Sequence, residues 1–245
     1  LDTTRPMALN AATNDVAFRS LILFDTRITH AHVVPTKSSY EAEIEEVKVG
    51  VRLIGYLLGV VLALPVTYGL IDWKSKNRGM VVNQWRVSFR TGDFGHNYLL
   101  RAAIAVNSLG NAIPQEAMFF HGFHDGDGTL LNGENNRYEV VFPADNLPPV
   151  DAFWSLTVYD ADNGFMVENP IDRYTISSRT EGVTFEPDGS LRFILSAEEP
   201  SEGVTNWLPV KKGGFTVTLR TYLPRPELMA LDWKPPAIQR IGGEA

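Results

Sequence analysis

The sequence predicts a mainly β protein, an antiparallel β-sandwich or jelly-roll domain with one short helix, preceded by a single transmembrane helix. Two observations carry this prediction. Residues 53–71 contain no charged side chain, and from residue 85 onward short apolar runs alternate with strong turn signals. Together they divide the chain into an N-terminal segment of unassigned role over 1–48, a transmembrane helix over 49–73 and a β-sandwich domain over 80–245.

The uncharged stretch, LIGYLLGVVLALPVTYGLI, matches the hydrocarbon thickness of a bilayer. Its 19 residues would extend about 28 Å as an α-helix. Arg52 before it and Lys74 and Lys76 after it are long side chains that reach lipid headgroups from the end of a helix. The alternative is a buried helix of a soluble domain, but a core helix usually keeps a polar stripe and this stretch has none. We therefore expect the protein to bind a membrane through residues 53–71.

The composition excludes several classes of function. The 245 residues include no cysteine, which rules out disulfides, thiol catalysis and thiolate metal sites. The 22 basic and 29 acidic residues give a net charge of −7, and from residue 80 onward 13 basic and 21 acidic residues give −8. Because nucleic-acid binding needs a basic surface that releases counterions, no nucleic-acid partner is expected.

One helix is expected inside the domain, in the segment NYLLRAAIAVNSLG. Its apolar residues recur at helical spacing and form one stripe: Leu99, Ala102, Val106 and Leu109. Gly110 follows this stripe and is typical of a helix end.

The remaining domain sequence is typical of β-strands joined by tight turns. The runs EAMFFHGF, RYEVVF, FWSLTVY, LRFILS and FTVTLRTYL are separated by turn sequences such as HDGDG, DADNG and EPDG. In the last run Phe215, Val217 and Leu219 alternate with polar residues, so one face of this strand is expected to enter a core and the other to face outward. Five or more such strands with few helices favour a sandwich or jelly roll.

Six phrases of the domain, in this order, resemble one known family. They are PQEAMFF, LPPVDAFWSLTVYD, ENPIDRYTISSR, PDGSLRF, TNWLP and FTVTLRTYLPRPELMALDWKPPAI. Their order and spacing over residues 85–241 are similar to the bacterial domain of unknown function DUF1214, which also occurs behind a partner domain, DUF1254. The resemblance implies a β-sandwich whose relatives are mostly uncharacterised, with a single membrane span before the domain in some of them.

The resemblance also implies a place in the cell. In anchored relatives the domain lies outside the cytoplasm, which predicts a bacterial inner-membrane anchor and a periplasmic domain. The charges that flank the span favour the opposite orientation, because three Lys and Arg residues precede it closely and five follow it. A difference of two charges discriminates poorly, so we prefer the orientation of the family.

The chain carries none of the common catalytic motifs. It has no G-x-S-x-G nucleophile elbow, no H-E-x-x-H zinc motif, no phosphate-binding loop and no dinucleotide fingerprint. No cofactor is therefore expected, and whether the protein is an enzyme stays open.

The segment HGFHDGDG holds the residues that come nearest to a metal-binding pattern. His121, His124, Asp125 and Asp127 are of the types that bind Zn²⁺ or iron. The two histidines would lie on opposite faces of a strand, however, and D-G-D-G is typical of a tight hairpin turn. We expect a solvent-exposed hairpin and no metal.

Two other phrases hold candidate ligand-binding residues. In ENPIDRYTISSR, Arg173 offers a planar donor fork for a carboxylate or phosphate and Tyr174 offers a stacking face. In TNWLP, Asn206 can donate and accept hydrogen bonds beside the broad face of Trp207, as in sugar sites. The structural alternative is that the first phrase braces a turn and that the tryptophan closes the end of the sandwich.

Glu116 is an isolated carboxylate at the start of the first strong strand. If buried it could serve as a general acid or base, and pairing with Arg101 or Arg220 is the structural alternative.

These residues leave three functions open. The first is an anchored, envelope-facing domain that binds a small polar or carbohydrate-like ligand or an envelope partner. The second is a hydrolase or lyase of polar or glycan substrates that uses Glu116 or an aspartate together with Arg173 and Tyr174. The third is an assembly role, including a homo-oligomer, in which an edge strand pairs with another chain.

Overall fold

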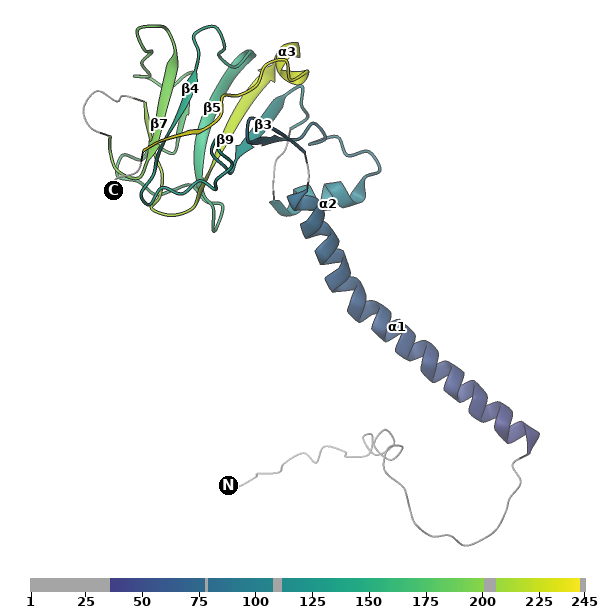
Figure 1. Cartoon of the computed structure of the whole chain (residues 1–245). Coiled ribbons are helices and arrows are strands. Elements are labelled where there is room, and N and C mark those ends of the chain that lie inside the picture. The colour runs from purple at the N-terminus through teal and green to yellow at the C-terminus, as the bar shows by residue number, and fades with distance from the viewer. Residues whose placement is uncertain (1–35, 78, 108–111, 201–205, 243–245) are drawn as a thin grey trace, which may run out of the picture. The chain divides into compact units, whose positions relative to one another are not determined.

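The structure is a computed structural model that describes residues 36–77, 79–107, 112–200 and 206–242. The elements in chain order are α1 (Lys37–Lys76), β1 (Met80–Val82), β2 (Trp85–Val87), α2 (Tyr98–Asn107), β3 (Ala117–Gly122), β4 (Arg137–Phe142), β5 (Val150–Asp160), β6 (Thr175–Ser177), β7 (Leu191–Ser196), β8 (Trp207–Pro209), β9 (Phe215–Pro224), α3 (Pro226–Met229) and β10 (Gln239–Gly242) (Figure 1). Most of the predicted N-terminal segment, residues 1–35, lies outside the described residues, as do Leu109 and Gly110.

The described part of the domain is mainly β and forms two sheets. The first sheet is antiparallel throughout and has the strand order β1-β2-β3-β9-β5-β6. The second has the order β10-β4-β7-β8, and here β7 and β8 run parallel. The predicted mainly antiparallel fold is confirmed, and the β7–β8 pair is a departure from it. Parallel pairing requires a connection longer than a hairpin turn, and ten residues separate the end of β7 from the start of β8.

Aromatic side chains from both sheets form the core, which makes the fold a sandwich. Trp154 of β5 lies 5.5 Å from Phe142 of β4 and 5.8 Å from Phe193 of β7, measured between ring centroids. Tyr138 of β4 lies 5.6 Å from Phe215 of β9. Strand β9 buries the alternating face that its sequence predicts, because Phe215 and its two apolar alternates are at most 1% exposed.

The β1–β2 hairpin is fastened to this core through the C-terminal segment. Trp85 of β2 is fully buried, and its indole Nε1 donates to the carbonyl of Pro236 at 2.7 Å. Asn83 in the turn donates from Nδ2 to the carbonyl of Pro235 at 3.0 Å. The hairpin is therefore part of the sandwich rather than a separate connector.

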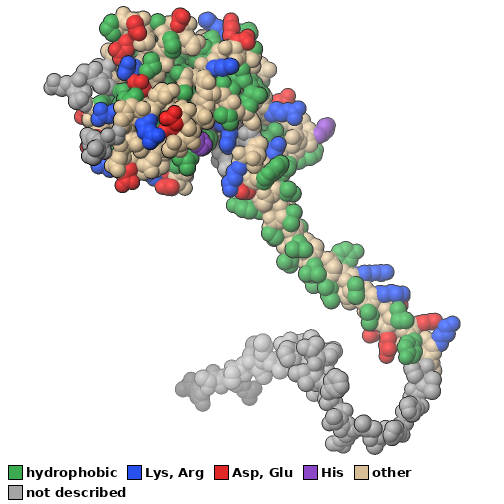
Figure 2. Space-filling model, in the orientation of Figure 1, with side chains coloured by type: hydrophobic (Ala, Val, Ile, Leu, Met, Phe, Trp, Pro, Cys, Tyr) green, Lys and Arg blue, Asp and Glu red, His purple; other side chains and the backbone are tan. Residues whose placement is uncertain are grey.

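Helix α1 is long and apolar enough to cross a membrane. It has 40 residues, reaches a mean hydropathy of 2.1 over 18 residues and buries none of its side chains. Its side chains are hydrophobic along the middle, and charged side chains gather toward its ends (Figure 2). The helix is about 60 Å long, which is more than the thickness of a hydrocarbon core. It begins at Lys37 and ends at Lys76, beyond the limits of 49 and 73 predicted for the transmembrane helix.

Helix α2 confirms the helix predicted within the domain but buries a different stripe. The buried residues are Leu100, Ala103 and Ile104, whereas Leu99 is half-buried and Val106 is 66% exposed. The segment is apolar on more than one side, so periodicity alone does not distinguish the stripe that packs from the one beside it.

Candidate functional site

The turn that contains the predicted Arg173 and Tyr174 is braced by its own side chains. Asn169 donates from Nδ2 to the carbonyls of Val167 and Arg173, at 3.0 and 3.1 Å, and its Oδ1 accepts from the Arg173 N–H at 2.9 Å. The Tyr174 hydroxyl donates to Asp172 Oδ1 at 3.2 Å. This hydrogen bond to a carboxylate holds the proton on the phenol and raises the pKa of Tyr174.

Arg173 reaches from this turn to β8. Its guanidinium Nη1 donates to the carbonyl of Trp207 at 2.9 Å. Trp207 is 4% exposed, and its indole Nε1 donates to the carbonyl of Ser196 at 3.1 Å. The structure thus brings Arg173 and Trp207 together, with both of these donors directed at backbone carbonyls.

Asn206 beside them is equally committed to the protein backbone. It is 5% exposed, its Oδ1 accepts from the Thr184 N–H at 3.0 Å, and its Nδ2 donates to the carbonyls of Thr184 and Arg192 at 2.7 and 3.0 Å. We call Asn169, Arg173, Asn206 and Trp207 the braced cluster. Its observed contacts are those of the structural alternative, and ligand binding by its residues stays a prediction.

Glu116 lies apart from this cluster. It is exposed and lies directly before β3, whereas Arg173 and Tyr174 lie directly before β6. Strands β3 and β6 are three strand spacings apart in the sheet, which is about 14 Å. Arg220, one of the partners considered for Glu116, donates instead to the hydroxyls of Thr157 and Tyr159. Glu116 therefore does not share a site with Arg173 and Tyr174, whereas Asp172 lies beside Tyr174.

The HDGDG segment forms a tight turn whose first aspartate is buried. Asp125 is 0% exposed, and its Oδ1 accepts from the N–H groups of Asp127 and Thr129 at 3.1 and 2.8 Å. Arg240 Nε lies 3.6 Å from its other oxygen. The turn was predicted, but Asp125 was expected to be solvated. Its carboxylate is buried because it holds the turn together and faces β10.

The two histidines of this segment have separate surroundings. His121 Nδ1 lies 3.1 Å from the hydroxyl of Thr218 on β9, and His124 pairs with Leu130 across the turn. Within the described part of the chain, no three His, Asp or Glu side chains gather as a metal-ligand set.

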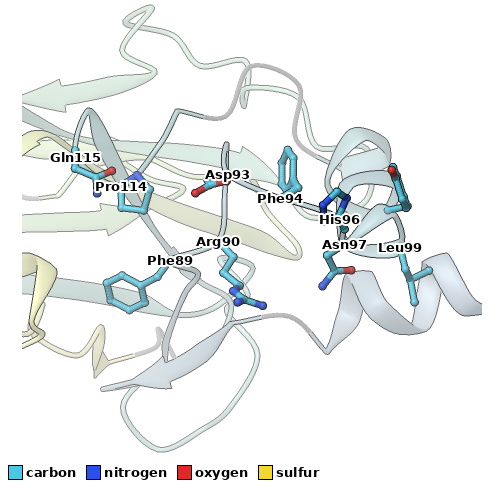
Figure 3. A pocket seen from close by; sticks show the side chains of 11 residues that line it. Phe89, Arg90, Asp93, Phe94, His96, Asn97, Leu99, Pro114 and Gln115 are labelled. Carbon is cyan, nitrogen blue, oxygen red and sulfur yellow. The ribbon is translucent and has the colours of Figure 1, made fainter.

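A large concave feature of the described residues lies after β2. It is a cleft of about 930 Å³ lined by Phe89, Arg90, Asp93, Phe94, Gly95, His96, Asn97, Tyr98, Leu99, Pro114 and Gln115. Figure 3 shows Phe89, Pro114 and Gln115 on one side and Phe94, His96, Asn97 and Leu99 on the other, with Arg90 between them. We call this feature the cleft.

The cleft combines aromatic surface with hydrogen-bonding groups. Tyr98 is 70% exposed, and Arg90 and His96 are exposed as well. Asn97 caps α2, since its Oδ1 accepts from the Leu100 N–H at 3.0 Å, and this fixes the helix end that carries Tyr98. Such a surface can stack on a ring, hydrogen-bond hydroxyl groups and pair with an anion.

Strand register places one wall of the cleft near the end of α1. Met80 pairs with Val87 across the hairpin, so the chain returns at residue 88 to the level at which β1 begins. Arg86 Nη1 also donates to the carbonyl of Lys76, the last residue of α1, at 2.9 Å. Phe89 and Arg90 therefore follow directly after a strand that is tied to the end of the helix.

Sequence reasoning missed the cleft. The segment FRTGDFGHNYL carries neither a strand alternation nor a helical stripe until α2 begins, so it reads as a connection. The signal that could have found it is the density of aromatic residues, arginine and histidine in a loop, where side chains without a packing role are more often functional.

The geometry defines a class of protein, a two-sheet β-sandwich domain that follows a long apolar helix. Residues 116–226 match the family model described as "Protein of unknown function (DUF1214)", and this part of the chain is a DUF1214 domain, as the resemblance predicted. The match covers β3 through β9, which is 111 of the 245 residues. Strands β1, β2 and β10 lie outside it but belong to the same two sheets.

Solved structures are similar to this chain over part of their length. The crystal structure of the VPA0106 protein from Vibrio parahaemolyticus is 26% identical, with a TM-score of 0.50, over 58% of this chain and 35% of that one. An uncharacterized protein from Burkholderia cenocepacia is 20% identical, with a TM-score of 0.33, over 55% of this chain and 31% of that one. The chain thus spans about a third of the length of each of these proteins. No curated protein matches the sequence.

Proposed function

We propose that this chain is a membrane-anchored DUF1214 domain that binds a small polar or carbohydrate-like ligand in the cleft. The observation that carries the proposal is a cavity of about 930 Å³ that Tyr98, 70% exposed, lines together with Arg90 and Gln115. A cavity lined by an exposed aromatic ring, an amide and a guanidinium suits a ring-shaped polar molecule, because the aromatic ring can cover its apolar face while the polar groups hold its hydroxyls.

The binding test uses the full chain in nanodiscs of zwitterionic lipid. Titration calorimetry with a panel of neutral and acidic saccharides measures affinity for wild type, Arg90→Ala and Tyr98→Ala. We expect a saccharide that binds wild type and loses about tenfold or more in affinity with either variant, the loss of one stacking or charge-assisted contact. The control Glu181→Ala removes an exposed side chain beside β6, at the opposite edge of the sheet from β1, and should leave affinity unchanged. Equal affinity of all four proteins would remove the cleft as the site.

We further propose an anchor in the bacterial inner membrane with the domain in the periplasm. The apolar helix supports the anchor, and the family resemblance supports this orientation, against the Lys and Arg count around the span. The absence of cysteine allows a direct test. Single Glu41→Cys and Glu181→Cys variants are treated with an impermeant maleimide on cells whose outer membrane has been made permeable. We expect labelling of residue 181 alone. Labelling of residue 41 alone would show the opposite orientation, and release of the protein by carbonate washing would contradict the membrane anchor.

The enzyme hypothesis needs titratable groups that converge on one cleft. Glu116 lies three strand spacings from Arg173 and Tyr174, so these three residues give the enzyme hypothesis little support. The assembly hypothesis has one observation in its favour, since β1 is an edge strand whose Met80 and Val81 are 49% and 60% exposed. Pairing of two such edges would give a dimer, which light scattering of the detergent-solubilised chain would detect.

A further inference from the structure

Charge is distributed unevenly along the chain beyond the apolar helix. Residues 72–107 hold six basic and two acidic residues, whereas residues 108–245 hold ten basic and twenty acidic ones. The part that follows the apolar stretch directly is therefore cationic, and the rest of the domain is strongly acidic. An anionic surface would attract the first part and repel the second.

The cationic part begins near the C-terminal end of α1, which ends at Lys76. Strand β1 starts four residues after α1 ends, which limits their separation to about 14 Å even for extended backbone. Because β2 pairs back along β1, Arg90 returns toward the same level. If α1 crosses a membrane, the cleft opens within reach of the headgroups of that membrane.

The exposed side chains of this part suit a lipid headgroup region. Met80, Val81 and Tyr98 are 49%, 60% and 70% exposed, and Arg90 and Arg101 are exposed cations in the same stretch of chain. Apolar side chains and tyrosine mixed with arginine are the composition that proteins place at membrane interfaces.

We propose that the cleft holds the anionic headgroup of a lipid from the membrane in which α1 is anchored. Arg90 pairs with the phosphate as a charge-assisted donor, and Tyr98 covers the glycerol or sugar portion of the headgroup. The inference rests on the proposed function, since it names the ligand class of the same cleft. Anchoring makes weak intrinsic affinity sufficient, because a tethered cleft meets lipid headgroups at a high effective concentration.

The experiment uses the full-length chain with a single reporter cysteine. Gln115→Cys, on the cleft wall, carries an environment-sensitive fluorophore, and Glu181→Cys beside β6 is the matched control, since five strand spacings or about 24 Å separate β6 from β1. Nanodiscs of phosphatidylcholine with increasing phosphatidylglycerol are compared. We expect a saturating blue shift at residue 115 only, with apparent affinity about fivefold lower in Arg90→Ala, as for the loss of one basic contact to an anionic membrane, and largely kept in Arg90→Lys.

Further arms separate the sources of the signal. Soluble glycerol phosphate added to phosphatidylcholine nanodiscs should give little response, and a response equal to that of the lipid would overturn the assignment to a membrane headgroup. A response of residue 115 to neutral saccharides but not to phosphatidylglycerol would overturn the inference and leave the proposed function standing. No response to any of these ligands would overturn both. Unchanged thermal unfolding of the Arg90 variants is the folding control, and the same lipid titration in Arg90→Ala as in wild type would also overturn the inference.

Discussion

The braced cluster and the cleft contain the same kinds of residue but use them differently. Each combines arginine, an amide side chain and a large aromatic ring. In the braced cluster, Arg173, Asn206 and the Trp207 indole all bond to backbone groups, and both Asn206 and Trp207 are buried. In the cleft, Arg90 and Tyr98 are exposed.

Residue type alone therefore does not distinguish a binding site from a set of side chains that stabilises the fold. A buried amide must have hydrogen-bond partners, because an unsatisfied polar group costs about 1–3 kcal/mol. Where the protein supplies every partner, the side chain stabilises the fold. Where it supplies few and the side chain is exposed beside a cavity, the group remains available to a ligand.

The largest effect is expected from Asn206→Ala. The change removes three hydrogen bonds to the backbone, one each with the N–H of Thr184, the carbonyl of Thr184 and the carbonyl of Arg192. We expect a loss of about 2–4 kcal/mol in the free energy of unfolding, measured by urea denaturation of the chain in detergent. Gln115→Ala, an exposed amide of the cleft, is the matched control and should change stability by less than about 0.5 kcal/mol. If both variants changed the free energy of unfolding equally, the distinction between the braced cluster and the cleft would be wrong.

A smaller loss is expected from Arg173→Ala. The guanidinium ties the turn before β6 to β8 through the Trp207 carbonyl, and its removal leaves that carbonyl without this donor. The expected loss is about 1–2 kcal/mol, with a lower thermal midpoint. Arg173→Lys keeps the charge but not the planar fork and should recover part of the loss. If Arg173→Ala instead leaves stability intact and weakens binding of a saccharide, the sequence-based assignment of Arg173 as a ligand-binding residue is correct.

The cleft should give the opposite result. Tyr98→Ala removes a ring that is 70% exposed, so the free energy of unfolding should change by less than about 0.5 kcal/mol, while affinity for the saccharide falls about tenfold or more. Leu100→Ala, two residues later on the same helix but 4% exposed, is the control that should lose about 2–4 kcal/mol. A destabilised Tyr98→Ala would mean that the ring packs rather than binds.

The fold was largely predictable from the sequence because its signals are local. Alternation in FTVTLRTYL and the turn chemistry of HDGDG depend on neighbouring residues, and the uncharged stretch 53–71 depends on length alone. The buried stripe predicted for α2 was wrong by one position. Leu99 and Leu100 each begin an apolar stripe, and tertiary packing decides that the stripe beginning at Leu100 is the buried one.

The site was not predictable for the corresponding reason. Whether Asn206 binds a ligand depends on Thr184 and Arg192, which are 22 and 14 residues away in the chain and become its partners only after folding. Likewise, Gln115 joins Arg90 at one cleft only because β2 and β3 pair. Spacing in a single sequence contains no information on such partners.

A third polar cluster is intermediate in exposure between the braced cluster and the cleft. Its substitution should have a smaller effect on stability than the substitutions in the braced cluster. Lys211 Nζ lies 2.7 Å from Asp160 Oδ1 and 2.6 Å from Asp162 Oδ2, with side chains 23%, 18% and 79% exposed. The hydrogen bond from Lys211 lowers the pKa of Asp160, and the two carboxylates raise the pKa of Lys211. The stabilisation is therefore present above the unfolded pKa of an aspartate, about 3.9, and is lost as the pH falls through the lower folded value.

Lys211→Met tests this coupling through pH. The thermal midpoint of wild type should exceed that of the variant at neutral pH, by less than the effect of Arg173→Ala, because partly exposed ion pairs are screened by water. The difference should shrink below pH about 4 as Asp160 takes up a proton. Lys234→Met, at an exposed lysine, should give a small difference that does not depend on pH in this range. A Lys211→Met difference that stays constant down to the acid limit would show that the side chain stabilises by packing. The cluster would then resemble the braced cluster, in which geometry and not charge decides the role.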